Sequence, residues 1–240
     1  SMGARRLRSC LVHPLKDIVR IRTRQDAVGE LLENRHLRLH IQELLDSIYD
    51  LERLTVRVSL GSAGPRDLVA LKNTLKTIPA VKRILGLFNS GLLSSLCAMT
   101  DEVEDAASLI ENAIMDTPAH NVRDGGVIRQ GYSLELDELR DTGAGGKDKI
   151  AAIEASERAR TGINSLKIGY NRVFGYYIEV TKSNLSGVPA EYMRKQTLTN
   201  AERYITPELK EWEEKILTAH DRSLGLEAAL YAKVVKELCG

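Results

Sequence analysis

Residues 156–204 combine a surplus of basic side chains with polar residues in turns, which suits phosphate binding. This segment has eight basic and four acidic residues, a balance of +4, whereas the formal net charge of the whole chain is +1. A phosphate backbone is the natural partner of such a surface, because the attraction needs no base recognition. Turns also direct short polar side chains and free backbone N–H groups outward. The residues predicted to contact a nucleic-acid backbone are Asn171, Arg172, Tyr177, Lys182, Arg194, Lys195, Asn200 and Arg203.

The alternative for any single Lys or Arg is a solvated charged surface. Clustering favours contact for the group, since Asn171 and Arg172 share one turn, Arg194 and Lys195 are adjacent, and Asn200 lies just before Arg203. We therefore predict backbone contact for the set of residues rather than for each member separately.

The same segment alternates between apolar and polar residues, which predicts two half-buried strands joined by a turn at 171–173. The apolar positions are Leu166, Ile168, Tyr170, Phe174, Tyr176, Ile178 and Val180. The stretch Arg172–Tyr177 also resembles the aromatic motif of RNA-recognition modules, whose exposed rings stack on bases. The alternation instead places Phe174 and Tyr176 in the core, and only Tyr177 faces outward.

Other chemistry is not supported by the residue spacing. A phosphate-binding loop of the form G-x-x-x-x-G-K-[ST] is absent: the nearest match, at Gly146-Lys147, has Asp141 in place of the first glycine and Asp148 in place of Ser or Thr. His36 and His40 have the i, i+4 spacing of a zinc pair, but the sequence offers no third ligand, which favours a solvated helix face.

An acidic group near residue 100 has a similarly ordinary explanation. Asp101, Glu102, Glu104 and Asp105 could hold two metal ions, but after Thr100 they are typical of an acidic first turn of a helix. Because no nucleophile has a nearby base, the sequence predicts no active site and no metal.

Composition indicates a globular chain. Of its 240 residues 43% are hydrophobic, 28% are charged and only 5% are aromatic, which suits helices packed by aliphatic side chains. The three cysteines, Cys10, Cys97 and Cys239, show no C-x-x-C spacing, so we expect reduced thiols rather than zinc or disulfides. No apolar run reaches the roughly 20 residues that span a bilayer. We therefore predict a cytoplasmic protein with no membrane partner.

Helical periodicity dominates outside the basic segment. Successive helices are predicted after Pro14 as far as Asn34, then over 37–48, 51–58, 68–85 and 92–115, with a loop at 118–126. Another helix is predicted over 134–160, although its central glycines each cost about 1 kcal/mol. The last helix is predicted to begin at Thr206-Pro207, an N-cap followed by proline, and to continue to Leu238. We infer that these last two helices form an antiparallel stalk that carries the strands.

Two stretches carry a specific family resemblance. The sequences GYNRVFGYYIEVTKSNL (169–185) and YMRKQTLTNAERYITPELKEWEEKIL (192–217) resemble the clamp and lever helices of the bacterial MutS family, which are DNA mismatch-recognition ATPases. The N-terminal stretch RRLRSCLVHPLKDIVRIRTRQDAVGELLEN is similar to the start of that family's helical core. The family's mismatch-reading domain and ATPase have no counterpart here, so we expect a middle fragment in which Ser1–Gly3 is an expression scar.

The resemblance implies a mainly α fold, with a helical core and long antiparallel lever helices that carry a small inserted antiparallel β clamp. The implied domains are 4–133, helical core and lever; 134–155, lever helix into the clamp; 156–205, β clamp; and 206–240, lever helix returning to the core. The clamp would contact duplex DNA non-specifically and close in response to nucleotide state. ATP, Mg, homodimerisation and downstream mismatch repair factors would belong to the full-length protein, a DNA-dependent ATPase. The alternative is a helical interaction scaffold whose β module binds a protein.

Overall fold

The computed structural model describes residues 2–171 and 173–239, without the side chain of Lys147. The chain divides into two compact units. One contains residues 1–132 and 228–240, and the other contains residues 133–227. The expected fold class is confirmed, because most elements are helices and the second unit carries a small antiparallel sheet.

The first unit is built from helices, several of which begin at an identifiable capping or proline residue. Asp17 caps α2 by accepting hydrogen bonds from the Val19 and Arg20 amides, and Pro65 occupies the first turn of α5. The helices are α1 (Met2–Val12), α2 (Ile18–Glu33), α3 (Arg35–Asp46), α4 (Leu51–Ser59), α5 (Pro65–Leu85), α6 (Gly91–Met99) and α7 (Glu104–Ala113), followed by the short 3₁₀ helix η1 (Val122–Asp124).

The prediction of one helix over 92–115 was wrong. The chain leaves the helix after Met99, and Val103 adopts a left-handed conformation with φ of 48° before α7 begins. The Asp101 carboxylate accepts a hydrogen bond from the Val103 amide at 3.1 Å. A short polar side chain that bonds the backbone in this way competes with helix formation, which explains the break.

The core of the first unit centres on α5 and α7. Leu68 and Ile110 are fully buried there, and Ile114 and Ile128, which form an isolated β-bridge, are buried next to α7. Tyr231, near the end of α9, donates a hydrogen bond to the Ala63 carbonyl at 2.8 Å. The C-terminal residues are thus an integral part of this unit.

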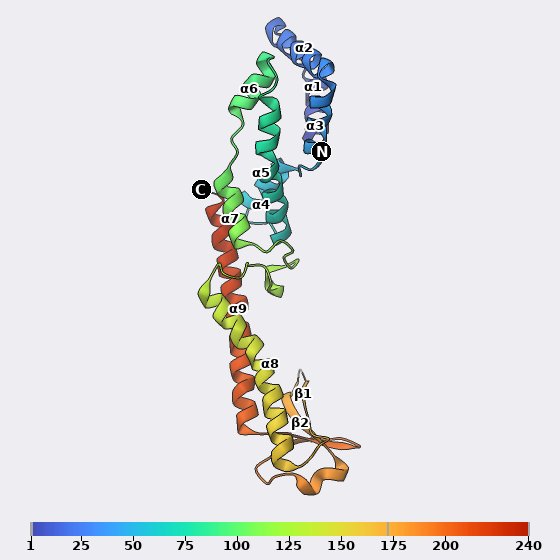
Figure 1. Ribbon diagram of the computed structural model, residues 1–240, viewed down its shortest axis with the longest axis vertical. Helices are drawn as coiled ribbons and strands as arrows, with labels where there is room; N and C mark the ends of the chain where they lie inside the picture. Colours follow the sequence, from blue (N-terminus) through green and yellow to red (C-terminus); the bar gives the residue numbers. More distant parts are fainter. Residues whose placement is uncertain (1, 172, 240) are drawn as a thin grey trace. The chain divides into compact units, whose positions relative to one another are not determined.

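The second unit contains two long helices, α8 (Leu134–Thr161) and α9 (Pro207–Glu237), of which the last turns of α9 belong to the first unit. They run antiparallel, because Arg140 near the start of α8 bonds Glu227 at 2.8 Å, far along α9. Figure 1 shows the two helices side by side. The glycines of α8 do not interrupt it, and Gly146 packs directly against Ile216 of α9.

Four strands follow α8: β1 (Lys167–Asn171), β2 (Gly175–Thr181), β3 (Met193–Thr197) and β4 (Ala201–Ile205), with a 3₁₀ segment η2 (Lys182–Gly187) after β2. The sheet order is β1-β2-β4-β3, and every pairing is antiparallel. Ile178 of β2 pairs with Ile168 of β1 and with Tyr204 of β4, and these pairs define the register of the three strands.

One face of the sheet packs on the two helices. Ile153 of α8 and Leu209 of α9 join Leu166, Ile178 and Val180 in a single buried cluster. Phe174, predicted to lie in this core, is 47% exposed instead. The turn extends through residue 174 and β2 begins at Gly175, so Phe174 lies outside the alternation that buries Ile178 and packs Tyr176 against the cluster.

Candidate nucleic-acid interface

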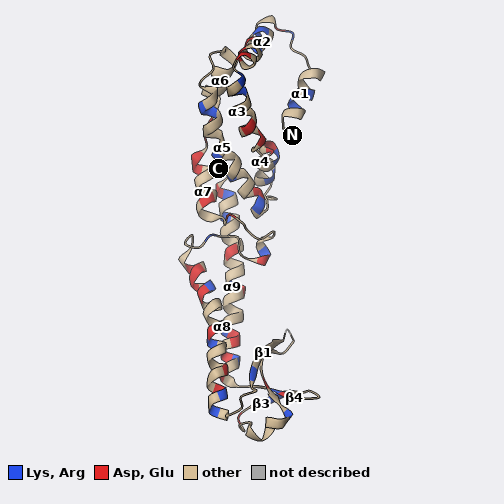
Figure 2. Ribbon diagram, turned by 45° about the vertical axis from the view of Figure 1, so that its right-hand side comes forward, with Lys and Arg blue, Asp and Glu red and all other residues tan. Residues whose placement is uncertain are grey.

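The outer face of the sheet, opposite the buried cluster, carries polar side chains because strand residues alternate between the two faces. Tyr177 and Glu179 of β2 and Arg203 of β4 lie on this face, since their neighbours Ile178 and Tyr204 are buried. Figure 2 shows basic residues on the strands of the second unit. The ionic partners of these residues determine which of them remain available to a ligand.

Three arginines of the segment are engaged with its four acids. Arg160 contacts Glu157 at 2.7 Å and Glu191 at 2.5 Å. Arg203 contacts Glu179 at 3.0 Å, and Arg194 lies 3.6 Å from Glu202. These four acids are all the acids of residues 156–204, so each acid of the segment is paired with one of three arginines.

The lysines are different. Lys167, Lys182 and Lys195 are exposed, and within the described part of the chain none of them forms an ion pair. A lysine ammonium on a flexible stem keeps all its donors available to a phosphate oxygen. Among the described basic residues of the segment, these three lysines are therefore the ones without an acidic partner. Lys167 was not among the predicted contact residues, although its outward position in the alternation could have identified it.

Lys195 lies at an irregularity in the edge strand. β3 pairs with β4 in two registers that shift between Arg194 and Gln196, so Lys195 is the extra residue of a β-bulge. Bulges bend an edge strand and change the direction of a side chain. An unpaired, exposed lysine at a bulge on a sheet edge is well placed to reach a ligand.

Tyr177 and Arg203 occupy the middle of the outer face and contact each other. The guanidinium carbon of Arg203 lies 4.1 Å from the centre of the Tyr177 ring. Arg203 also donates to Gln196 at 3.0 Å, and its side chain is only 19% exposed. The Tyr177 ring in turn covers Gly169, where a side chain would overlap with it. These two predicted contact residues thus pack against each other on the sheet, and the Arg203 guanidinium is already hydrogen-bonded to Glu179 and Gln196.

Three of the predicted residues, Asn171, Lys182 and Asn200, lie near the two ends of β2. Asn171 pairs with Gly175 at one end, and its side chain accepts a hydrogen bond from the Val173 amide at 2.8 Å. At the other end the Lys182 amide donates to the Asn200 carbonyl at 3.0 Å, which brings these two residues together. Six residues of strand separate the ends, or about 20 Å. Arg172 lies outside the described residues.

Two buried tyrosines mark the boundary between the sheet and the helices. Burial, followed by a hydrogen bond to Glu202, raises the pKa of Tyr204 to about 12. Burial and a hydrogen bond to Glu157 raise the pKa of Tyr192 further. Both phenols therefore stay neutral at physiological pH and act as donors to carboxylates. Glu157 and Glu202 are therefore each occupied as hydrogen-bond acceptors.

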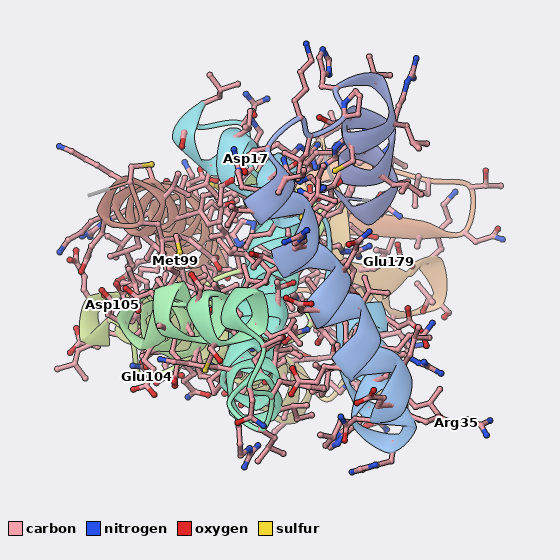
Figure 3. The ribbon with its side chains drawn as sticks, turned by 90° about the horizontal axis from the view of Figure 1, so that it is seen from above. Asp17, Arg35, Met99, Glu104, Asp105 and Glu179 are labelled. Carbon is pink, nitrogen blue, oxygen red and sulfur yellow. The ribbon has the colours of Figure 1, made fainter. Side chains whose placement is uncertain are left out.

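The remaining sequence candidates do not assemble into a site. Among the described residues no group of three or more His, Cys, Asp and Glu side chains is arranged to hold a metal ion. Glu104 and Asp105 form the acidic first turn of α7, and both are exposed (Figure 3). Asp101 and Glu102 precede that helix, and Glu102 contacts Lys82 at 3.2 Å. In the described part of the chain, no helix is both long and apolar enough to cross a membrane.

Known proteins resemble this chain along its whole length. Residues 131–222 match the family model described as MutS family domain IV. The DNA mismatch repair protein MutS of Pelotomaculum thermopropionicum is 47% identical over 100% of this chain and 28% of its own length. The MutS proteins of Solibacter usitatus and Alkaliphilus oremlandii are 52% and 49% identical, each over 98% of this chain and 27% of the relative. The chain thus spans just over a quarter of the length of these curated relatives.

Proposed function

The chain belongs to the MutS family of DNA mismatch repair proteins, and from this premise we propose that residues 156–205 act as a clamp on the backbone of duplex DNA. The sheet would grip phosphates without reading sequence. Residues 134–155 and 206–240 would act as levers, and the helices of residues 4–133 would form the core from which the levers extend.

The observation that carries this proposal is that the acids of the segment pair with arginines and not with its lysines. Every acid of the segment pairs with one of three arginines, and Lys167, Lys182 and Lys195 remain exposed without an acidic partner in the described residues. Attraction to phosphate depends on uncompensated charge. Backbone contacts by lysine position a protein on a duplex and carry no direct sequence information.

The outer face also favours backbone contact over base stacking. Tyr177 is the aromatic residue at its centre, and Arg203 covers one side of its ring. Stacking on bases requires an open ring face. A surface that offers lysines and a polar turn at Asn200, with its aromatic ring already engaged, suits phosphates and sugars.

We assign the coupling role to α8 and α9. Both helices contribute to the buried cluster beneath the sheet, so a displacement of either helix would move the sheet. In the longer proteins of the family, ATP and Mg would bind outside the region that corresponds to this chain, which lacks a phosphate-binding loop in its sequence. Homodimerisation and contacts with downstream mismatch repair factors are likewise proposed for the longer protein.

A second candidate function rests on a different feature, the tip of the β1–β2 hairpin. Val173 is 80% exposed and Phe174 is 47% exposed there. Exposed apolar residues of this kind are common at surfaces that bind proteins. On this alternative the sheet would be a protein-binding module at the end of a helical scaffold.

A salt titration separates the two functions. Binding of a fluorescently labelled duplex is measured by anisotropy between 50 and roughly 200 mM salt, a range in which backbone contacts weaken steeply. We expect the logarithm of the affinity to fall linearly with the logarithm of the salt concentration, with a slope of about −0.9 for each phosphate neutralised. Absence of binding at the lowest salt concentration would reject the clamp and favour the protein-binding alternative.

A further inference from the structure

Two carboxylates, one from each long helix, accept hydrogen bonds from the backbone of the β1–β2 hairpin. Glu154 of α8 accepts from the Ile168 amide at 2.6 Å, and Glu213 of α9 accepts from the Tyr176 amide at 3.2 Å. β1 is an edge strand, and β4 pairs with β2 only from Ile178 onward. The helices thus supply acceptors to the hairpin where the sheet itself supplies no neighbouring strand on that side.

The backbone at Gly175 is fitted to the Glu213 carboxylate. Gly175 has φ of 77°, a conformation that favours glycine, and a Cβ at this position would overlap with the carboxylate of Glu213. The hairpin therefore approaches α9 as closely as a backbone can. Close approach of this kind fixes the position of the strand relative to the helix more tightly than side-chain packing would.

The second contact, between Glu154 of α8 and the Ile168 amide, is reinforced by a neighbouring arginine. Arg158 forms an ion pair with Glu154 at 2.6 Å and donates to the Leu166 carbonyl at 2.6 Å. Two neighbouring side chains of α8 thus bind an N–H and a C=O of the chain that enters β1. The apolar cluster beneath the sheet is non-directional, whereas these hydrogen bonds depend on angle as well as distance.

We propose that Glu213 and Glu154 are positioning residues that fix the direction in which the sheet extends from α8 and α9. This rests on the proposed function, because direction matters if the end bearing Lys182 and Asn200 must meet a phosphate backbone. Lys182 lies six residues after Tyr176, or about 20 Å along the strand, so a 10° rotation at the contact displaces that end by about 3 Å. Such a displacement is enough to break a hydrogen bond to phosphate.

The direction in which the sheet extends from the helices can be measured without DNA. Spin labels at Thr199, in the β3–β4 turn, and at Thr218 of α9 report the distance between the far end of the sheet and the helix, with the three native cysteines replaced by serine. We expect a narrow distance distribution in the parent, a broader one in Glu213→Ala, and recovery in Glu213→Gln, whose amide oxygen still accepts from Tyr176. An unchanged distribution in Glu213→Ala would overturn the proposal, whether or not the chain binds DNA.

DNA affinity provides a second measurement, in which the direction of the change is informative. Glu213→Ala removes a negative charge, which by itself would strengthen binding to a polyanion. Glu213→Gln has the same charge as Glu213→Ala. If Glu213 is a positioning residue, the alanine variant should bind DNA roughly fivefold more weakly than the glutamine variant. Equal affinities of the two variants would contradict the proposal, whereas a parent that fails to bind DNA would contradict the clamp function only.

Gly175→Ala covers the case in which Glu213→Ala does not fold. The added methyl group displaces the carboxylate while leaving it in the chain, so the distance distribution should broaden in the Glu213 parent. Gly162→Ala is the control for backbone strain, because Gly162 also has a positive φ, of 70°, but open space around its Cβ. Equal broadening by Gly175→Ala and Gly162→Ala would show that the carboxylate does not hold the hairpin.

Discussion

At the scale of single residues, the ionic partner of a basic side chain matters more than its place in the sequence. Arg203 and Lys195 were equivalent candidates on sequence grounds. In the structure Arg203 contacts Glu179 and lies against Tyr177, whereas Lys195 is exposed at the bulge of β3. Removing an internally compensated charge and removing a free one should therefore have different consequences for DNA binding.

Lys195→Ala should weaken DNA binding, and by a similar factor for duplexes of unrelated sequence. The salt slope should fall by about one unit, the effect of losing one neutralised phosphate. Lys233→Ala on α9 is the matched control, because Lys233 is also exposed but belongs to the other unit. Anisotropy across a salt series measures both variants. If they bind alike at every salt concentration, Lys195 does not contact the backbone.

Asp116 should make folding stability depend on pH in the acid range. Hydrogen bonds from Lys72 and Arg129 lower its pKa from 3.8 to about 2. Since the folded state holds the proton less tightly than the unfolded state, this stabilisation is present above pH 3.8 and is lost as pH falls through about 2. The melting temperature of Asp116→Asn should therefore depend less on pH over this window. Parallel melting curves for parent and variant across the window would contradict the assignment.

At the scale of elements, α8 contains glycines with opposite roles. A Cβ at Gly143 would meet no other atom within 4 Å, whereas one at Gly146 would overlap with Ile216 of α9. Gly143→Ala should stabilise the chain by about 0.5–1 kcal/mol through helix propensity. Gly146→Ala should lose that gain and destabilise by roughly 1–3 kcal/mol through overpacking. Chemical denaturation compares the pair, and equal stabilisation by both would show that α8 and α9 do not pack closely there.

Most of the helices were predictable from the sequence, whereas α1, β3 and β4 were not among the predicted elements. The helix ends at Asn34, Pro65 and Pro207 coincide with caps and proline positions. The break before α7 was missed because Val103 adopts a conformation that β-branched residues rarely take, so residue type gave no warning. Phe174 was misplaced because the length of the hairpin turn depends on backbone geometry that apolar alternation does not encode.

The candidate site was predictable in outline only. Net charge and turn residues located the segment, but ion pairs such as Arg203–Glu179 depend on strand register. The contact between Glu213 and Gly175 joins residues from α9 and the hairpin. It was not predicted because an exposed glutamate on a helix has many ordinary roles. Single-sequence patterns report which face a residue occupies, and tertiary packing decides its partner.

At the scale of the whole molecule, the chain corresponds to just over a quarter of its curated relatives, 28% in one case. If its DNA contacts are confined to the backbone, binding should be indifferent to a mismatch, because phosphate contacts carry no direct sequence information. A G·T duplex and its matched control should therefore bind with equal affinity in competition anisotropy. A tenfold preference for the mismatch, or about 1.4 kcal/mol, would require base readout by this chain.

The most direct test of the clamp is a lysine footprint. Each lysine is acetylated at low reagent concentration with and without a saturating duplex, and its modification rate is followed by mass spectrometry. The account predicts that Lys182 and Lys195 react more slowly when DNA is bound, while Lys233 and Lys236 of α9 in the other unit are unaffected. Protection confined to the first unit, or unchanged rates at Lys182 and Lys195 with DNA demonstrably bound, would contradict it.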